Sequence, residues 1–326
     1  MGFGEIIGHP TQIQSLTGAL VRGRLHHAYV FVGPEGVGKR TVAVSLAKAI
    51  HCTVADGDFC DHCVACVQIA KRNHPDVRFL ELQPNRKEIS IAQVRELERD
   101  LTYRSFTGKK KIAIIDPAGA LNATAQNALL KTLEEPSGDT VMILIGKSPS
   151  DLLPTVRSRC LTVAFAALAK PVLADYLINR EGKSPEDAEY LSALAAGSLG
   201  AARQLGAAGF LEKRRDWAEI VGGLRGGDWR AAVAAAERLA GGRDEALRVV
   251  RWLETWYRDM LVYAVSGEEG EIANRDLLSH LRQRSARPEQ ILSLLSRTAE
   301  ASRRLQRNLN YRMVLEDLLL EAAAKL

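Results

Sequence analysis

The chain has 326 residues, 46% hydrophobic and 25% charged, which is the composition of a globular protein with two or three domains. It has no run of 18 or more apolar residues, and its start lacks a basic segment followed by an apolar one, so we expect neither a membrane span nor a secretory signal, and we expect a cytoplasmic location. A formal net charge of +5 is compatible with a nucleic acid nearby but is too weak to indicate a DNA-binding surface.

The first predicted strand leads into a glycine-rich phosphate loop. His27 to Val32 is a short apolar run, typical of a buried parallel strand, and Gly38 to Ile50 has apolar residues at helical spacing. The loop between them reads Gly33-Pro34-Glu35-Gly36-Val37-Gly38-Lys39-Arg40-Thr41. In such a loop the backbone N–H groups and the helix N-terminus bind phosphates, and the lysine reaches the outer ones. The candidate phosphate-binding residues are Gly33, Gly36, Gly38, Lys39 and Thr41.

The residue after the lysine departs from this pattern. A serine or threonine at that position would bind Mg²⁺, but the residue is Arg40, and Thr41 comes one position later, where the helix turns its hydroxyl elsewhere. The alternative interpretation is a glycine-rich turn that only fits a helix against a strand. The sequence leaves open whether this loop binds ATP or ADP.

Four of the five cysteines follow the first helix. Cys52, Cys60, Cys63 and Cys66 are separated by seven, two and two residues. Four thiolates complete a tetrahedral shell around Zn²⁺ and leave no position open, so we predict a structural zinc site, against the alternative of four unrelated thiols. Phe59 is the only aromatic residue among them, which disfavours nucleic-acid binding through this segment.

Strand-like and helical segments then alternate. The predicted strands are Val77 to Leu82, Lys111 to Asp116, Val141 to Gly146 and Leu161 to Phe165, and the predicted helices are Ile91 to Leu101 and Asn122 to Leu133. This alternation predicts an α/β domain with a parallel sheet that is covered on both faces.

The strand that ends at Asp116 bears on hydrolysis. An acid at the end of an apolar strand is the usual site of a carboxylate that orders Mg²⁺, and in hydrolysing enzymes a glutamate follows to orient the attacking water. Here Pro117, Ala118 and Gly119 follow instead. Because the base and the metal-binding hydroxyl are both absent from these positions, we predict negligible turnover.

The rest of the chain has only helical patterns. Breaks at glycine- and proline-containing segments predict a small helical unit over residues 167–207 and a larger one over 208–326, after an α/β domain over 1–166. Trp252 and Trp256 lie four residues apart, which indicates a helical face in a core more than a partner surface. The basic groups Lys109 to Lys111 and Arg303 to Arg307 are read as solvated surface more than as phosphate contacts.

Two motifs resemble the clamp-loader branch of the AAA+ ATPases. Asn127 to Pro136 reads Asn-Ala-Leu-Leu-Lys-Thr-Leu-Glu-Glu-Pro, and Ser158-Arg159-Cys160 follows it. The cysteine cluster, His74-Pro75-Asp76 and Gly23 to Tyr29 strengthen the resemblance, which spans about residues 5–207. Within that branch the chain is most similar to the delta-prime type of subunit of the bacterial DNA polymerase III clamp loader. The resemblance implies that residues 167–207 form a lid and residues 208–326 a collar domain.

The resemblance also implies a role for Arg159. It would be an arginine finger, aimed at the γ-phosphate of ATP that a neighbouring subunit holds. Phosphoryl transfer spreads negative charge over the equatorial oxygens, and a planar, permanently charged guanidinium stabilises that charge. Without the flanking motif, the favoured interpretation of Arg159 would be a salt bridge to a nearby acid within the sheet edge.

Other positions depart from the active relatives. Those relatives carry an arginine after Gly-Ser-Leu in the lid, whereas Leu199 is followed by Gly200, and the next arginine is Arg203. Gly146-Lys147 replaces the polar residue expected at the end of the fourth strand. The resemblance therefore implies a subunit that keeps the fold, hydrolyses no ATP itself and assists a neighbour.

The partners that the resemblance implies are the other subunits of a hetero-pentameric ring. These are ATPase subunits of the gamma/tau type and a delta-type subunit, which together place a sliding clamp on primer–template DNA during replication, without a membrane. Two other functions stay open. A self-sufficient ATPase would show turnover by the isolated chain that Lys39→Ala abolishes. A zinc-dependent nucleic-acid-binding module would show tight DNA binding by the lone chain that chelation removes.

Overall fold

The computed structural model describes residues 2–84, 86–136, 139–207, 209–269, 272–282, 286–307 and 309–325. Their contacts divide the chain into two compact units. The first unit is Met1–Tyr176 with Ala195–Ala201, and the second is Leu177–Leu194 with Ala202–Leu326. The three-part division at residues 166 and 207 stays a prediction.

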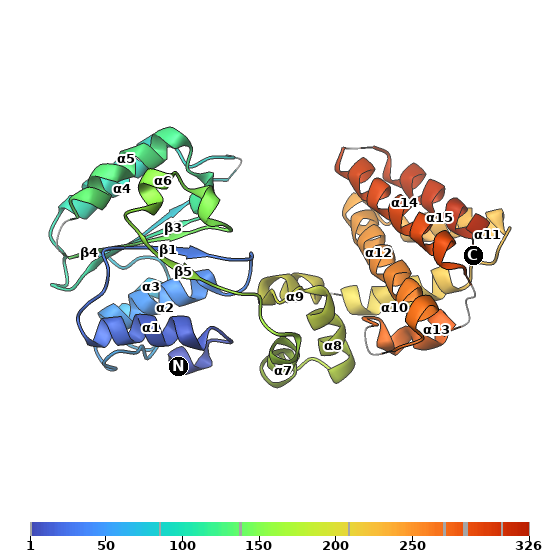
Figure 1. The fold of residues 1–326 in the computed structure, drawn as a ribbon, viewed down its shortest axis with the longest axis horizontal. Coiled ribbons are helices and arrows are strands. Elements are labelled where there is room, and N and C mark those ends of the chain that lie inside the picture. The colour runs from blue at the N-terminus through green and yellow to red at the C-terminus, as the bar shows by residue number, and fades with distance from the viewer. Residues whose placement is uncertain are drawn as a thin grey trace. The chain divides into compact units, whose positions relative to one another are not determined.

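The first unit contains a five-stranded parallel sheet with helices on both faces (Figure 1). The strands are β1 (Ala28–Val32), β2 (Val77–Glu81), β3 (Lys111–Asp116), β4 (Thr140–Ile145) and β5 (Leu161–Ala164). They lie in the order β2-β3-β4-β1-β5, and each neighbouring pair is parallel. Every residue of β1 and β4 is buried, as expected for central strands of a sheet that is covered on both faces. The predicted parallel α/β sheet is confirmed.

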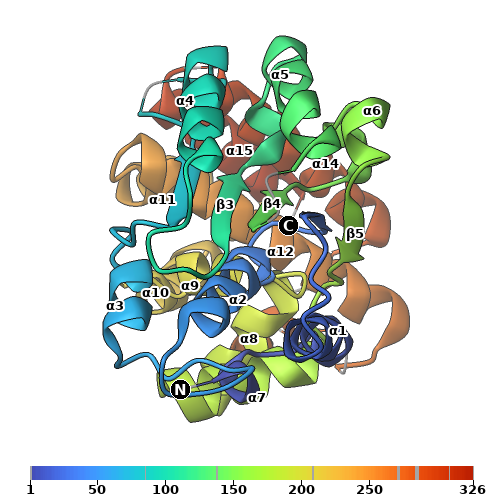
Figure 2. The ribbon, with the colours of Figure 1, turned by 90° about the vertical axis from the view of Figure 1, so that its left-hand side faces the viewer.

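The residues of β1 alternate between two cores. Ala28, Val30 and Val32 face one core, and Tyr29 and Phe31 face the other. The first core includes residues of α4 (Ile91–Thr102) and α5 (Ala123–Glu134), and the second includes residues of α1 (Pro10–Val21), α2 (Lys39–His51) and α3 (Val64–Ala70). Figure 2 shows α4 and α5 on one side of this sheet and α1 and α2 on the other.

Short elements and caps set the ends of these helices. The Asn122 side chain accepts a hydrogen bond from Ala125 N at 2.9 Å, and Ser90 and Gln93 form a capping box at the start of α4. The remaining short elements of this unit are η1 (Phe3–Glu5), η2 (Ala118–Ala120), η3 (Pro149–Asp151) and α6 (Pro154–Arg157). The predictions for α2, α4 and α5 are correct to within a residue or two, whereas α1 and α3 were not predicted.

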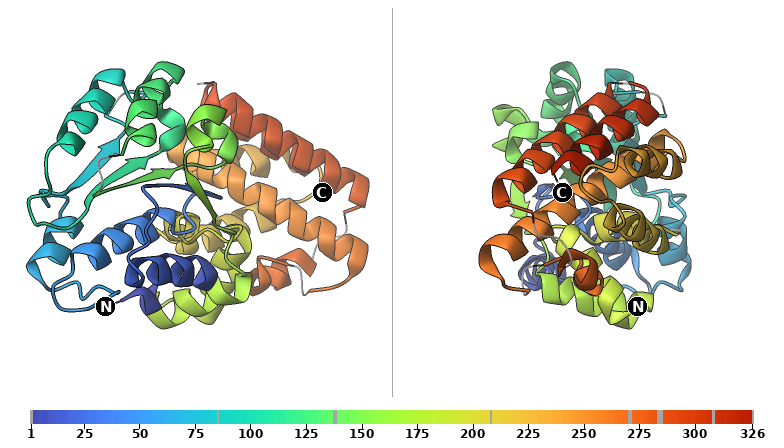
Figure 3. Two further views of the ribbon diagram at one scale, coloured as in Figure 1. Left: turned by 60° about the vertical axis from the view of Figure 1, so that its left-hand side comes forward. Right: turned by 90° about the vertical axis from the view of Figure 1, so that its right-hand side faces the viewer.

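The described part of the chain after β5 is helical. Its elements are α7 (Lys170–Glu181), α8 (Pro185–Leu194), α9 (Leu199–Leu205), α10 (Phe210–Gly222), α11 (Trp229–Leu239), α12 (Arg243–Ser266), η4 (Arg275–Leu277), α13 (Leu278–Arg282), α14 (Pro288–Gln306) and α15 (Tyr311–Lys325). Helices α12, α14 and α15 pack against one another (Figure 3). Trp252 and Trp256 on α12 are buried, which confirms that they belong to a core. No described helix combines the length and the hydropathy needed to cross a membrane.

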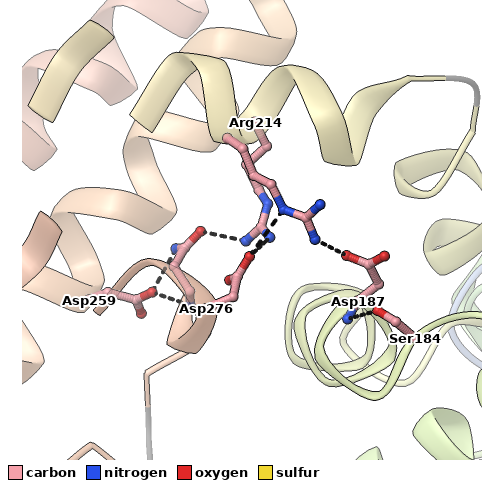
Figure 4. A network of polar contacts seen from close by, with 7 residues as sticks. Ser184, Asp187, Arg214, Asp259 and Asp276 are labelled. Carbon is pink, nitrogen blue, oxygen red and sulfur yellow. Dashed lines mark hydrogen bonds and ion pairs between the residues drawn. The ribbon is translucent and has the colours of Figure 1, made fainter. Parts of the chain in front are cut away.

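A buried arginine joins several helices of the second unit (Figure 4). Arg214 of α10 is fully buried, stacks on the Tyr190 ring of α8 with its Cζ 3.8 Å from the ring centroid, and binds Asn274 and Asp276. The buried Asp259 of α12 accepts hydrogen bonds from the backbone and side-chain nitrogens of Asn274. Since these buried charges are paired with polar groups, the network holds α8, α10, α12 and the segment before α13 together.

Candidate functional site

The glycine-rich loop lies between β1 and α2, as predicted. Gly33, Gly36 and Gly38 have φ of 143°, 73° and 114°, a region that side chains with a Cβ rarely enter. Lys39 is buried, and its Nζ donates to Gly33 O and Pro34 O, both at 2.6 Å. Burial lowers the pKa of Lys39. The lysine therefore binds carbonyl groups of its own loop.

Arg40 lies against Asp116, the acid that is expected to order magnesium. Its Nη1 is 3.1 Å from Asp116 Oδ2, and its Nη2 binds the carboxylate of Glu81. Glu81 ends β2 and Asp116 ends β3, and the two residues are paired in the parallel register. Burial raises the pKa of Asp116, while the Arg40 guanidinium acts in the opposite direction. A guanidinium thus supplies the positive charge between two strand-end carboxylates, and Thr41 is exposed.

Lys39, Arg40 and Asp116 line a cavity of about 540 Å³. Pro117 borders it after Asp116, and Lys147 forms an exposed ion pair with Glu35 at 2.8 Å. Asp151 accepts a hydrogen bond from the Lys147 backbone N–H at 2.6 Å. The cavity is lined by cations and carboxylates that largely pair with one another, and Pro117 stands where hydrolysis needs an acid.

Gly200 packs directly on the glycine-rich loop. Its N–H donates to Gly36 O at 2.9 Å, and a Cβ added at Gly200 would lie 3.0 Å from Gly36 Cα. A larger residue at position 200 would therefore push against the loop backbone. This close approach gives a physical reason for a glycine where the active relatives are expected to carry an arginine.

Arg159 lies beyond the short helix α6. Its Nη2 is 2.7 Å from Glu134 Oε1, and its Nη1 donates to Thr155 O at 2.8 Å and to Ser158 Oγ at 3.3 Å. The Arg159 side chain is 36% exposed and that of Glu134 is 50% exposed. Arg159 thus forms a salt bridge within the single chain, but with an acid at the end of α5 and not within the sheet edge, and its guanidinium is still partly open to solvent.

The surroundings of Arg159 form a cavity of about 490 Å³, which His26, His27 and Cys160 also line. The His26 and His27 rings lie 4.3 Å apart, and burial lowers the pKa of His27. The charged and titratable groups that line this cavity thus include the Arg159 guanidinium, the half-exposed Glu134 carboxylate and the imidazoles of His26 and His27.

A buried glutamine of α5 anchors the segment that carries Arg159. Gln126 Oε1 accepts a hydrogen bond from Leu153 N at 2.7 Å, and its Nε2 donates to Leu121 O at 3.0 Å and to Asp151 O at 3.3 Å. Because Leu153 is the N-cap of α6, these bonds fix the start of the helix that leads to Arg159. No local pattern in the sequence predicts these contacts of Gln126, Glu81 and Glu134, although Glu134 belongs to the Asn127 to Pro136 motif.

The four predicted metal-binding cysteines come together. Their sulfur atoms all lie within 4.8 Å of one another, and Cys52, Cys60 and Cys66 are buried. Backbone N–H groups donate to three of the sulfurs: Ala55 to Cys52, Cys63 to Cys60, and Cys66 to Cys63. These four cysteines could bind one metal ion.

The acidities of the thiols differ within this cluster. Burial raises the pKa of Cys66 to about 12. Burial acts in the same direction on Cys63, but backbone N–H groups of Thr53 and Cys66 outweigh it and lower its pKa to about 6. Four thiolates so close together require a cation among them, which is the chemistry of a closed sulfur site.

A second cluster beside the cysteines is structural. His51, His74 and Asp76 are buried and close enough together to hold an ion. However, Asp76 already accepts hydrogen bonds from Ser105 Oγ, Phe106 N, and the backbone and side chain of Thr107, at 2.7–3.0 Å. These donors outweigh burial and lower the pKa of Asp76 to about 2. The carboxylate thus anchors the loop before β3.

Comparisons with known proteins agree with the resemblance seen in the sequence. A family model described as DNA polymerase III, delta subunit, matches residues 8–169, and one described as DNA polymerase III, delta subunit, C terminal, matches residues 232–323. DNA polymerase III subunit delta' of Pseudomonas aeruginosa is 32% identical over 311 residues, which cover 93% of each chain.

Two further relatives show how far the similarity extends. The delta' subunit of Bacillus subtilis is 30% identical over 323 residues, which cover 95% of each chain. The tau subunit of Escherichia coli is 32% identical over 203 residues, which cover 60% of this chain and 31% of tau. The identity to delta' thus extends over nearly the whole length of both chains, and the chain belongs to the family of DNA polymerase III delta' subunits.

Proposed function

We propose that this chain is a non-hydrolysing subunit of a replicative clamp loader that supplies Arg159 in trans to the ATP site of a neighbouring subunit. The observation that carries the proposal is the contrast between its two cationic sites. Arg40 takes the place of a metal ion between two of the chain's own carboxylates, whereas the Arg159 guanidinium pairs with one half-exposed carboxylate, that of Glu134, beside a cavity.

The residues around Arg40 support the absence of hydrolysis. Mg²⁺ bound to a nucleotide would need Asp116 and a hydroxyl after Lys39, but Arg40 pairs with Asp116 and Thr41 is exposed. Pro117 has no acid to orient a water molecule. These features count against a self-sufficient ATPase.

Family membership supports the proposed partners. Relatives named as delta' and tau subunits of DNA polymerase III match this chain, so we place it beside ATPase subunits of the gamma/tau type and a delta-type subunit in a hetero-pentameric ring. That assembly would open a sliding clamp and set it on primer–template DNA. Arg159 would make ATP hydrolysis conditional on assembly, because no subunit holds a complete active site alone.

Reconstitution with the other loader subunits tests this function. The isolated chain should show no ATPase activity, and the complex should need the chain for DNA-stimulated hydrolysis. Arg159→Ala should leave the complex assembled, as judged by size-exclusion chromatography, and lower its ATPase rate. Arg157→Ala, an exposed arginine two residues away, is the matched control. An unchanged rate in the assembled Arg159→Ala complex would defeat the proposal.

For the cysteine cluster we propose one structural zinc ion held by Cys52, Cys60, Cys63 and Cys66. Metal analysis of the purified chain should find one equivalent of zinc. Cys66→Ser should lose it and lower the free energy of unfolding by several kcal/mol (order of magnitude), since metal binding and folding of such a module are coupled. Cys160→Ser, which changes the cysteine outside the cluster, should keep the zinc. A metal-free wild-type chain of normal stability would rule the zinc site out.

A further inference from the structure

We propose that Glu134 is a positioning residue for Arg159, which holds the guanidinium on its own chain until a neighbour's ATP displaces it. This inference rests on the trans role of Arg159 proposed above. If Glu134 has this role, it raises the KM of the complex for ATP and has little influence on the rate at saturating ATP.

The geometry places Arg159 in a docked position. One guanidinium nitrogen binds Glu134, and a second binds Thr155 O and Ser158 Oγ. Thr155 and Ser158 lie on the same short segment as Arg159 itself, whereas Glu134 lies on α5, far away in the sequence. Glu134 is therefore the one partner among these contacts that ties the arginine to another element.

Glu134 stands at a position that does not suit an acid for helix stability. It is the last residue of α5, where the unpaired carbonyl groups carry partial negative charge and favour a cation. Glu135 follows it as the C-cap and is exposed. The positive charge of the Arg159 guanidinium offsets the repulsion between Glu134 and the helix end. Glu134 therefore gains more from its contact with Arg159 than from its place in the helix.

The ion pair between Glu134 and Arg159 is weak enough to be broken when Arg159 binds another anion. A half-exposed ion pair changes an equilibrium by at most about fivefold, because water screens it. A finger that meets a transferring phosphoryl group contributes on the order of a thousandfold or more in rate. ATP that already binds Arg159 in the ground-state complex must first break the Glu134 contact. The cost of breaking it then falls equally on the ATP-bound state and on the transition state, so it affects KM and leaves kcat unchanged.

The test measures kcat and KM for ATP in complexes reconstituted with full-length variants. Glu134→Gln should lower KM two- to fivefold at low salt, with kcat within twofold of wild type. Glu134→Asp, which keeps the carboxylate, should restore KM toward the wild-type value. Glu135→Gln changes the exposed neighbouring acid and should leave both constants unchanged. Thermal unfolding of each variant confirms that the chain is folded.

Two further measurements separate this inference from the proposed function. In an Arg159→Ala background, Glu134→Gln should no longer change KM, because the restrained group is gone. If Arg159→Ala lowers the rate but Glu134→Gln leaves KM unchanged or raises it, the positioning role is wrong and the finger stands. If Arg159→Ala has no effect at all, the proposed function itself fails.

Discussion

Arg40 and Arg159 have the same exposed side-chain fraction, 36%, yet their surroundings assign them opposite roles. Arg40 binds two acids, Glu81 and Asp116, which end adjacent strands of one sheet. Arg159 binds a single acid at the end of a helix, and that acid is half exposed.

Because the two exposures are equal, the difference between these arginines lies in their partners. Removing Arg40 would take the ion-pair partner from Asp116 and leave Glu81, its neighbour in the sheet, with Arg72 alone, so Arg40 is part of its own site. Releasing Arg159 leaves Glu134 open to water, which costs little. Lys39 and Arg40 of the phosphate loop thus bind groups of their own chain, whereas Arg159, after α6, has a partner that it can leave at small cost.

The largest expected effect is a loss of ATP hydrolysis when the guanidinium of Arg159 is replaced by another cation. Arg159→Lys keeps the charge but loses the planar, forked donor group. We expect ATP hydrolysis at the neighbouring site to fall at least about tenfold, close to the effect of Arg159→Ala. Steady-state ATPase assays of the complex measure it, with Arg157→Lys as control. Full activity of the lysine variant would mean that charge alone is sufficient.

A smaller effect is expected at Arg40. Arg40→Ser leaves Asp116 beside Glu81, which keeps its ion pair with Arg72, so the free energy of unfolding should fall by about 1 kcal/mol, a value discounted for the partial exposure of these groups. The freed carboxylates should also bind Mg²⁺, so millimolar Mg²⁺ should raise the unfolding temperature of Arg40→Ser but not that of wild type. Lys87→Ser, at an exposed lysine of the same cavity, is the control. Equal stabilisation of wild type by Mg²⁺ would contradict the metal-like role of Arg40.

The smallest effect is expected at Lys39. Lys39→Ala removes the donor to Gly33 O and Pro34 O, and these carbonyl groups can then bind water in the cavity, so stability should change by less than about 1 kcal/mol. The ATPase rate of the complex should stay within twofold of wild type. The same substitution in an ATPase partner is the reference for an active phosphate loop. A comparable loss of activity in this chain would show that its loop takes part in catalysis.

The sheet could be predicted from the sequence because its strands are short apolar runs that alternate with helical segments. Helix α1 was missed since only Leu16 among its residues is buried, which leaves a weak amphipathic pattern, although Pro10 at its start was an available signal. Helix α3 was missed because it has only seven residues, and because the spacing of Cys63 and Cys66 was interpreted as a metal-binding pattern and not as the start of a helix.

The candidate site was predicted in part. The glycines of the loop and the four cysteines are local patterns, and the structure brings the four sulfur atoms together and gives the glycines positive φ. Lys39, which was predicted to reach phosphates, binds carbonyl groups of its own loop. The pairing of Arg40 with Glu81 depends on β2 and β3 being neighbours in register, and strand order is not a local property. The contact between Glu134 and Arg159 joins two helix ends across the fold, which a linear pattern cannot reveal.

The most direct measurement is a single-turnover ATPase experiment on a complex in which the finger arginines of the ATPase subunits are replaced by alanine. Only the site beside this chain then receives an arginine. With the wild-type chain we predict a burst of about one ATP hydrolysed per complex, and with Arg159→Ala no burst. A burst of the same size and rate with Arg159→Ala would show that this chain does not complete its neighbour's active site.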